Sequence, residues 1–437
     1  MTVNFALQVI FSWASLAEGT GVHNMNQEQR KIVALSAMGG MLEFYDFTVY
    51  GLFAVYFAAQ FFPGSDRFAA IMATYAVFLV GYIVRPVGGI IFSHIGDEIG
   101  RKTVLIITMI LMGVASLGIG CLPTYETIGL WAPILMVFLR LLQGLAVGGE
   151  LPSTIVYVME SIPNQRGLAI GITFAGVLSG LIPGMLINIL MTHFLSTEQI
   201  SAFGWRIPFI LGSILCFLAY QIRQKLHETK AFVALKKHNK FPLLELFQHH
   251  FGKLLIGIGL ISILATSIML VLIFMPTYLV KILNFSSEKA SANIFFVTVL
   301  SIISVYITAK LTNYFSSVRL MKYSLVGVVI GAAIFYFMLY MSHNFLWAIV
   351  IFVLFQGALV TLPLALLGTL FPVEIRLTGV ALSYNLAFVL FGGLTPIVVT
   401  ALIQHTQMPY MMPFIWLLAV SVVALIACYA SKLLDKL

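Results

Sequence analysis

The sequence predicts an all-α membrane protein of twelve transmembrane helices, arranged as two six-helix bundles related by a pseudo-two-fold axis. Three observations support this. Of the 437 residues, 60% are hydrophobic and only 9% are charged, whereas a soluble domain carries about 25% charged residues. The apolar stretches run roughly 20 residues or more, the length of a helix that crosses ~30 Å of hydrocarbon. Features of the first half also recur in the second half.

Twelve spans are expected to be helices, because lipid forces a spanning segment to satisfy its backbone polar groups internally. The short alternating segments of a transmembrane barrel are not found in the sequence. The expected spans are 32–61, 68–94, 103–122, 130–159, 167–194, 205–223, 254–281, 288–311, 319–341, 344–371, 377–403 and 410–433.

The spans divide the chain into four parts. Residues 1–30 are expected to be a cytoplasmic segment, 31–223 the N-terminal bundle, 224–252 a cytoplasmic linker and 253–437 the C-terminal bundle. Residues 1–24 are interpreted as an extension lying on the surface, or as a start assigned too early, because the polar sequence from Met25 leads naturally into the first span.

An internal repeat connects the two bundles. Gln143-Gly144 in the fourth span recurs as Gln356-Gly357 in the tenth, an offset of 213 residues. Arg166 after the fourth span and Arg376 after the tenth are offset by 210. A shared offset indicates a duplicated six-helix unit, and parallel repeats of this kind characterise one large transporter architecture.

The distribution of charge predicts orientation and excludes other classes. With the N-terminus inside, 18 Lys and Arg residues, including Arg223, lie in cytoplasmic segments and four lie outside. Both termini are therefore expected on the cytoplasmic side of the membrane, which is interpreted as a bacterial inner membrane.

The net charge is +8, but the basic residues do not form a stripe of the kind that binds nucleic acid. No cysteine has metal-ligand spacing, and no nucleophile–base pair lies at membrane depth, so neither a metal site nor an enzyme is expected.

One loop carries a specific motif. The segment after the second span contains Arg85-Pro86, His94, Gly96-Asp97 and Gly100-Arg101-Lys102. It resembles the signature loop of the major facilitator superfamily, in the version of its metabolite:proton symporter family. The resemblance covers nearly the whole chain, and further matching segments are 42–47, 140–150, 205–209, 228–232 and 371–396. Two departures are Glu98, where the family usually has arginine, and the loop 310–319, which has lost the Asp and Gly positions.

The resemblance implies a major facilitator fold and proton-coupled uptake by alternating access, with H+ as coupling ion and no cofactor. The family includes carriers of proline and betaine, citrate, 2-oxoglutarate and shikimate, so the expected partner is a small carboxylate or zwitterion, and a single chain is the expected functional unit. Segment 228–232 is slightly more similar to the proline/betaine branch.

The resemblance also implies a cytoplasmic gate. Asp97 would pair with charges of the other half, including Arg376, and Glu160 would join this network. Arg101 and Lys102 complete the predicted gate. The alternative interpretation is a solvated loop that only follows the positive-inside rule.

Two carboxylates fall near the middle of the first span. Glu43 and Asp46 are three residues apart and share one helical side, which Tyr50 extends. A charge at this depth costs a few kcal/mol or more and should therefore face a cavity. Because burial favours the neutral form of a carboxyl group, both residues are predicted to couple transport to protons. The alternative is a permanent ion pair that holds helices together.

Arg85 and Arg140 also lie within spans, and Gln143 shares the helical face of Arg140. A guanidinium binds a carboxylate through two hydrogen bonds, so these residues are predicted to bind substrate, with Tyr50 beside them. The alternative is that the arginines neutralise the buried acids, which include Glu150. Tyr384 and Asn385, deep in the eleventh span, either line the second-half side of the cavity or bond across helices.

Rival functions remain at this point. Gly167, Gly176 and Gly180 have the spacing of the fifth-span motif of superfamily antiporters, although the following proline is displaced to Pro183. A facilitator or a proton-antiport exporter is thus one alternative, and a transporter-like substrate receptor is another.

Overall fold

The computed structural model describes residues 25–62, 73–74, 76–77, 80–235, 241–285, 287–342 and 346–434. Across these ranges the regular structure is entirely helical, which confirms the predicted fold class. In this part of the chain, eleven helices are long and apolar enough to cross a membrane. The expected second span, 68–94, falls partly outside the described residues, as does the interpretation of residues 1–24.

The chain divides into two compact units. The first contains the described residues up to Tyr157 together with Gly176–Ala234, and the second contains Val158–Ala175 and the described residues from Leu235 onward. The sequence-based division assigned 158–175 to the N-terminal bundle, whereas in the structure this stretch packs with C-terminal residues. The contact is close: Gly171 lies against Ala309, and a Cβ added to Gly171 would be 2.4 Å from the Ala309 Cβ.

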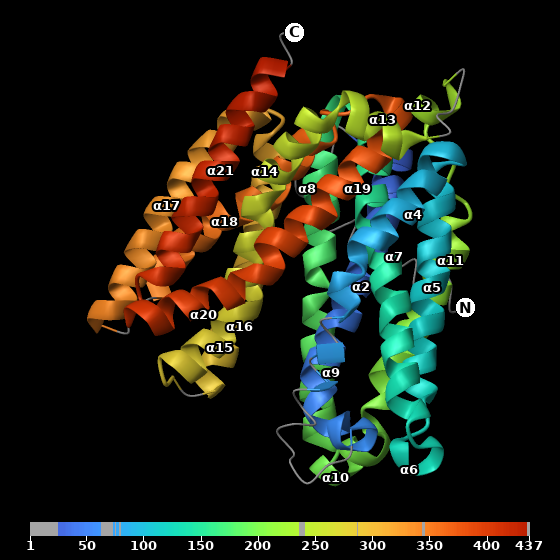
Figure 1. Cartoon of the computed structure of the whole chain (residues 1–437), viewed down its shortest axis with the longest axis vertical. Helices are drawn as coiled ribbons and strands as arrows, with labels where there is room; N and C mark the ends of the chain where they lie inside the picture. The colour runs from blue at the N-terminus through green and yellow to red at the C-terminus, as the bar shows by residue number, and fades with distance from the viewer. Residues whose placement is uncertain are drawn as a thin grey trace. The chain divides into compact units, whose positions relative to one another are not determined.

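The described helices of the first unit include α2 (Gln27–Phe61), α4 (Arg85–Glu98), α5 (Arg101–Cys121), α9 (Leu181–Phe194) and α11 (Arg206–Arg223). Helix α7 (Trp131–Ser161) belongs to this unit except for its last turn, and α8 (Arg166–Ser179) belongs mostly to the second unit. Shorter helical pieces are α6 (Tyr125–Ile128), α10 (Thr197–Gln199), η3 (Ile200–Gly204) and α12 (Lys230–Val233). Helix α2 packs on α9 and α11, and α5 packs on α4 and α11 (Figure 1).

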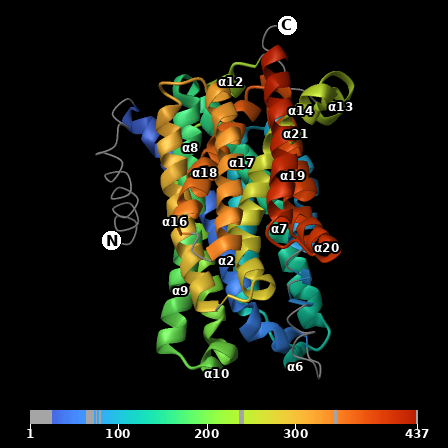
Figure 2. The ribbon, with the colours of Figure 1, turned by 90° about the vertical axis from the view of Figure 1, so that its left-hand side faces the viewer.

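The second unit contains α14 (Phe251–Ile268), α16 (Ser287–Leu311), α17 (Ser317–Ser342), α18 (Leu346–Leu367), α19 (Arg376–Ala387), α20 (Leu394–Thr406) and α21 (Met412–Leu434). Shorter pieces are η2 (Pro163–Gln165), α13 (Pro242–His249), α15 (Met275–Thr277), η5 (Tyr278–Ile282) and η6 (Val373–Ile375). Helix α18 packs on α16 and α17, and α17 packs on α21, so these four run side by side in Figure 2.

The internal repeat is visible in α7 and α18, each of which is the fourth span of its half. Pro152 lies inside α7 and Pro363 inside α18, 211 residues apart. In each helix the repeated glycine packs on the backbone of the second span of its own half: a Cβ on Gly144 would lie 2.1 Å from the Gly81 carbonyl oxygen, and one on Gly357 would lie 3.0 Å from the Ser301 carbonyl oxygen. The fourth and tenth spans therefore use the same close approach.

Among the described residues, two spans of the second unit contain π-helical turns. One span has η4 (Met269–Phe274), after α14, and η5, after α15, and the other has η7 (Phe388–Gly393), between α19 and α20. Segments η4 and η7 lie against each other, because a Cβ on Gly392 would be 3.3 Å from the Met269 Cγ, and Thr266 at the end of α14 donates its hydroxyl to the Phe391 carbonyl at 3.3 Å. Such turns leave backbone groups without their usual helical partners and often occur at functional sites.

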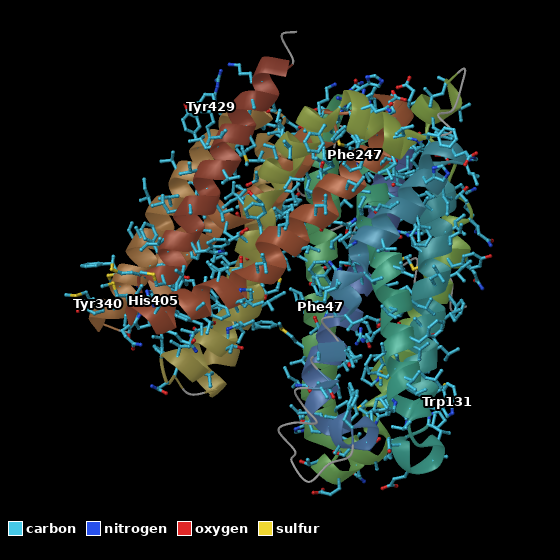
Figure 3. The ribbon with its side chains drawn as sticks, viewed as in Figure 1. Phe47, Trp131, Phe247, Tyr340, His405 and Tyr429 are labelled. Carbon is cyan, nitrogen blue, oxygen red and sulfur yellow. The ribbon has the colours of Figure 1, made fainter. Side chains whose placement is uncertain are left out.

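Many large apolar side chains are exposed on the outside of the helices. Trp131 on α7, Tyr340 on α17 and Tyr429 on α21 are 65%, 63% and 53% exposed (Figure 3). In water such a surface would be unstable, whereas in a bilayer lipid tails cover it. The chain is therefore a multi-pass membrane protein.

Candidate functional site

A small cavity lies inside the first unit. Its volume is about 30 Å³, which is room for a water molecule or two. It is lined by Glu43, Asp46, Phe47, Gly81, Tyr82, Arg85, Met112, Arg140, Gln143, Gly144 and Val147. Four of these residues are ionisable acids or arginines, so this apolar region of the membrane holds a concentrated set of charges.

The two acids come from the middle of α2. That helix begins with a capping box, in which the Asn26 side chain accepts from the Gln29 N–H at 2.8 Å. Glu43 and Asp46 are 3% and 2% exposed. Buried hydrophobic clusters lie on either side of the two acids along the helix; Leu42 belongs to one cluster and Tyr50 to the other. The acids are thus enclosed in an otherwise apolar helix, on one face, as the sequence spacing predicts.

Glu43 and Arg85 form a loose ion pair. The Arg85 Nη2 and Glu43 Oε1 atoms are 3.5 Å apart. Among the described residues, neither Glu43 Oε2 nor Arg85 Nε has a hydrogen-bond partner. The guanidinium of Arg85 also lies over the Tyr82 ring, 3.9 Å from its centroid. This arginine is therefore held near the cavity with part of its hydrogen-bonding capacity unused.

Local sequence explains why Arg85 is placed there. Helix α4 begins at Arg85, with Pro86 in its first turn. Proline has no N–H to donate to the carbonyl four residues earlier, so the ladder is interrupted at Tyr82. Glycines then allow close packing on α7, because a Cβ on Gly148 would lie 2.1 Å from the Arg85 carbonyl oxygen. The backbone of Arg85 is consequently fixed against the fourth span.

Asp46 sits in a hydrogen-bonded network. Its Oδ2 accepts from the Ser116 hydroxyl and from Gln143 Nε2, the latter at 2.9 Å. Arg140 Nη1 donates to Gln143 Oε1 at 2.6 Å and interacts electrostatically with Asp46. Asp46 Oδ1 has no hydrogen-bond partner within the described ranges. Gln143 therefore connects the acid to the arginine instead of leaving them in direct contact.

Tyr50 contacts Arg140 of this network on the side away from the cavity. Its ring lies 3.4 Å from the Arg140 guanidinium carbon, and its hydroxyl donates to the Thr74 carbonyl at 3.1 Å. Tyr50 is fully buried and is not among the residues that line the cavity. The predicted stripe along α2 exists, but its third member orients Arg140.

A further buried ion pair lies near the same helices. Arg223 Nη1 and Glu150 Oε1 are 2.7 Å apart, and Arg223 is fully buried. Arg223 also donates to the carbonyls of Leu35 and Leu105, each at 3.1 Å. The prediction that Arg223 lies in a cytoplasmic segment is wrong, because the last turn of α11 directs its side chain into the helix bundle. Its spacing from other residues gave no signal of this.

The predicted gate residues of the first unit form a compact cluster. Asp97 and Arg101 are paired at 3.3 Å, and both side chains are fully buried. Arg101 also lies 4.6 Å over the Phe232 ring. The backbone N–H of Lys102 donates to Glu228 Oε2 at 3.0 Å. Segment 228–232 thus contacts the start of α5 through both Glu228 and Phe232 and holds the loop between α4 and α5 in place.

Gly100 makes this loop possible. Its φ is 133°, a conformation that side-chain-bearing residues rarely adopt. A Cβ at this position would also lie 2.3 Å from Glu228 Oε2. The glycine of the motif therefore has a direct steric explanation.

The other predicted gate residues pair within the second unit. Arg376 Nη1 lies 3.0 Å from Glu160 Oε1, and Arg376 Nε donates to the Phe371 carbonyl at 3.2 Å. The pairing of Asp97 with a charge of the opposite half stays a prediction.

Tyr384 and Asn385 are buried inside the second unit. The Tyr384 ring lies 4.6 Å from that of Phe388, and Asn385 Nδ2 donates to the Ala381 carbonyl at 2.9 Å. Both residues precede the π-helical turn η7. Their predicted contact with substrate remains a prediction. In the described ranges, no three His, Cys, Asp or Glu residues are grouped as a metal site would require.

Comparisons with known proteins agree with this geometry. Residues 36–396 match the family model described as Major Facilitator Superfamily. A Staphylococcus aureus protein named as a proline/betaine transporter is 33% identical over 408 residues, covering 91% of this chain and 87% of its own length. The citrate-proton symporter of Klebsiella pneumoniae is 30% identical over 409 residues, with 90% of each chain covered.

Two further matches extend the comparison. The glycine betaine/proline/ectoine/pipecolic acid transporter OusA of Dickeya dadantii is 30% identical over 419 residues, which cover 91% of this chain and 82% of OusA. The solved structure of the proton:xylose symporter XylE superposes with a TM-score of 0.76 at 18% identity, covering 92% of this chain and 94% of XylE, and so supports the fold. The chain therefore belongs to the Major Facilitator Superfamily and is one of its membrane transporters, not an enzyme.

Proposed function

We propose that this protein takes up a small carboxylate-bearing metabolite together with protons, by alternating access across a bacterial inner membrane. The observation that carries the proposal is the cavity shared by Glu43, Asp46, Arg85 and Arg140. Each carboxylate has one oxygen without a hydrogen-bond donor in the described part of the chain, Glu43 Oε2 and Asp46 Oδ1. A buried ionised carboxylate is stable only when its oxygens are well satisfied, so these two groups are suited to bind and release a proton.

Protonation would change what the arginines bind. While Asp46 is ionised, it holds Gln143 through Oδ2, and Gln143 holds Arg140. A proton on Asp46 removes the negative charge near Arg140, which then gains by binding another carboxylate. The same argument applies to Glu43 and Arg85, whose 3.5 Å pair is already loose. The required link between proton binding and substrate affinity thus follows from shared partners.

We propose a zwitterion of the proline or betaine type as the first candidate substrate. The cavity offers guanidinium groups for a carboxylate, and acids together with the Phe47 and Tyr82 rings for a cationic nitrogen. These rings meet edge to face at 5.5 Å between centroids. The relatives named for proline and betaine transport support this choice.

A tricarboxylate is the second candidate substrate. Two arginines in one cavity suit a multiply charged anion, and the relative from Klebsiella is named for citrate. Competition between labelled proline, glycine betaine and citrate for uptake separates the two candidates.

The remaining parts of the proposal concern topology and composition. The excess of Lys and Arg on one side supports cytoplasmic termini. A single chain with H+ as its coupling ion, and with no cofactor, suffices for this mechanism.

Uptake into proteoliposomes with an imposed pH gradient tests the function. Accumulation above the outside concentration, abolished by a protonophore, is the expected result. Equilibration without accumulation would indicate a facilitator, and accumulation only when the gradient is reversed would indicate an antiporter. Binding without flux would indicate a receptor.

Variants of the two acids locate the coupling. Asp46→Asn is expected to abolish accumulation while substrate exchange across the membrane at equal pH continues, because exchange requires no net proton movement. Glu43→Gln is compared in the same assay. Glu98→Gln is the matched control, because that acid is nearly half exposed and lies outside the cavity. If both cavity variants still accumulate substrate, the coupling role assigned to these acids is wrong.

A further inference from the structure

Three carboxylates lie at successive levels of α2. Asp46 and Glu43 belong to the helix itself, three residues apart. The third belongs to Glu150 of α7, which lies against Gly39: a Cβ on Gly39 would be 2.0 Å from Glu150 Oε1. Since a helix rises about 1.5 Å per residue, the levels of 46, 43 and 39 are separated by about 4.5 Å and about 6 Å. The acids therefore form a series directed toward the N-terminal end of α2.

Each acid in the series has its own basic partner. Arg140 serves Asp46 through Gln143, Arg85 serves Glu43, and Arg223 serves Glu150. Two acids of the series also affect each other, because Glu43 and Glu150 are close enough to interact electrostatically.

The surroundings of Glu150 are polar as well as buried. Thr108 of α5 donates its hydroxyl to Glu150 Oε2. The Ser36 carbonyl accepts from Arg223 at 3.3 Å. The Ser36 hydroxyl is buried, with no hydrogen-bond partner in the described ranges, so it can hold a water molecule next to the pair.

Gly39 is necessary for this arrangement. Besides the contact with Glu150, a Cβ there would lie 2.2 Å from Arg223 Nη2. A side chain at position 39 would therefore separate the Glu150–Arg223 pair from α2 and from the level of Glu43.

We infer that Glu150 is a proton relay, which receives the coupling proton from Glu43 and passes it toward the cytoplasmic side. This inference rests on the proposed proton symport. It assigns a role to an ion pair that does not line the cavity. The direction follows from the position of Gly39, four residues nearer than Glu43 to the cytoplasmic end of α2.

The step balances as a simple proton transfer. The carboxyl group of Glu43 loses its proton to a water molecule, which gives a proton to the Glu150 carboxylate. Arg223 stays charged and keeps its bonds to the Leu35, Leu105 and Ser36 carbonyls. Glu150 then releases the proton to cytoplasmic water and pairs with Arg223 again. No electrons move and no bond other than O–H breaks.

A structural role is the competing explanation. Removing one member of a buried ion pair leaves the other charge unpaired and destabilises the fold. The test therefore compares Glu150→Gln with the double variant Glu150→Gln/Arg223→Gln, in which neither charge remains. Glu150→Asp, which keeps a carboxylate, and Glu98→Gln, outside the series, are the controls. Thermal unfolding of each purified protein shows which variants are folded.

Two transport measurements separate relay from structure. We expect the folded double variant to exchange substrate at equal pH at a rate similar to that of the wild type. Its accumulation under a pH gradient should fall by about 100-fold, the scale on which a positioned proton-transfer group contributes. Glu150→Asp should recover part of the accumulation, and the ratio of protons to substrate should fall only in the neutral variants.

The outcomes distinguish this inference from the function on which it rests. Without gradient-driven accumulation by the wild type, the proposed function itself fails. When the wild type accumulates and Asp46→Asn does not, but the double variant still accumulates normally, only the relay is overturned. An equal loss of exchange and accumulation in a folded double variant also overturns it, since a structural pair would affect both.

Discussion

Gln143 donates to Asp46 through its amide nitrogen, at 2.9 Å, and accepts from Arg140 through its amide oxygen, at 2.6 Å. One neutral side chain thus lies between an acid and a base that would otherwise pair directly. A direct pair in a nonpolar interior is hard to separate. The amide lets the charge on Asp46 change while Arg140 keeps a partner, which is the property that a coupled site requires.

Replacement of Gln143 by leucine tests this arrangement. Gln143→Leu removes a donor from Asp46 and an acceptor from Arg140, and hydrogen bonds to charged groups contribute about 1.5–3 kcal/mol each. Initial uptake rates in proteoliposomes should therefore fall roughly 10- to 100-fold.

The matched control uses the other half of the repeat. Gln356 holds the equivalent position and bonds to the Ser301 hydroxyl at 3.1 Å, without an ionised partner in the described ranges. Gln356→Leu should therefore change uptake much less. Equal losses in the two variants would mean that the amide serves helix packing in both halves.

The two cavity arginines should respond differently to lysine. Arg85 is paired loosely and keeps an unused Nε, whereas Arg140 lies on the Tyr50 ring at 3.4 Å. Arg85→Lys should raise the KM for uptake roughly tenfold, because lysine cannot form a two-point contact with a carboxylate. Arg140→Lys should in addition lower stability by about 1–2 kcal/mol, because a lysine ammonium cannot stack on the ring as the planar guanidinium does.

Uptake kinetics and thermal unfolding of the same preparations measure both effects. A larger KM for Arg140→Lys than for Arg85→Lys, with unchanged stability, would show that Arg140 contributes more than Arg85 to substrate binding and that its contact with the Tyr50 ring does not stabilise the fold.

The spacing of residues could predict the face of α2, but not the depth of each partner. Glu43 and Asp46 lie together, as an i, i+3 pair must. Tyr50 continues the same stripe, yet it is covered by Arg140 and lies behind the cavity. Which residues of a stripe reach a cavity depends on the neighbouring helices, and sequence periodicity carries no information about them.

Arg223 shows the limit more clearly. A basic residue at the end of a span normally lies in the interface between membrane and water, so no internal role could be predicted for Arg223 from its position. The structure pairs it with Glu150 and three backbone carbonyls. Only the packing of α11 against α2 and α5 decides this, and that packing is formed by residues far apart in sequence. The fold class, in contrast, follows from local hydropathy and was predictable in full.

The buried pair of the cytoplasmic loop should control stability. Asp97→Asn removes the counter-charge 3.3 Å from the fully buried Arg101, and breaking such a pair costs about 3–5 kcal/mol. The adjacent Glu98 makes a 3.5 Å contact to His94, with both side chains nearly half exposed, so Glu98→Gln should change stability by less than about 0.5 kcal/mol. Thermal unfolding in detergent compares the two. Similar unfolding temperatures would show that Asp97 is not stabilised by Arg101 in the folded protein.

The contact between the second and fourth spans should be sensitive to a single methyl group. A Cβ at Gly148 would lie 2.1 Å from the Arg85 carbonyl oxygen and 2.9 Å from the Gly89 nitrogen. Because these are backbone atoms, they cannot turn away, and Gly148→Ala must move α4 relative to α7. Such overpacking costs about 1–3 kcal/mol and displaces Arg85 from the cavity, so substrate affinity should fall together with stability.

A glycine of α14 gives the matched control for this effect. A Cβ at Gly252 would meet no atom of the described residues within 4 Å, and alanine is the better helix former by about 1 kcal/mol. Gly252→Ala should therefore leave uptake unchanged and keep or raise the unfolding temperature. If Gly148→Ala transported normally while Gly252→Ala did not, close packing of the second and fourth spans could not be what positions Arg85. Arg85 would then have to be held by its own side-chain contacts, with Glu43 and the Tyr82 ring, and Glu43→Gln should become the more damaging change.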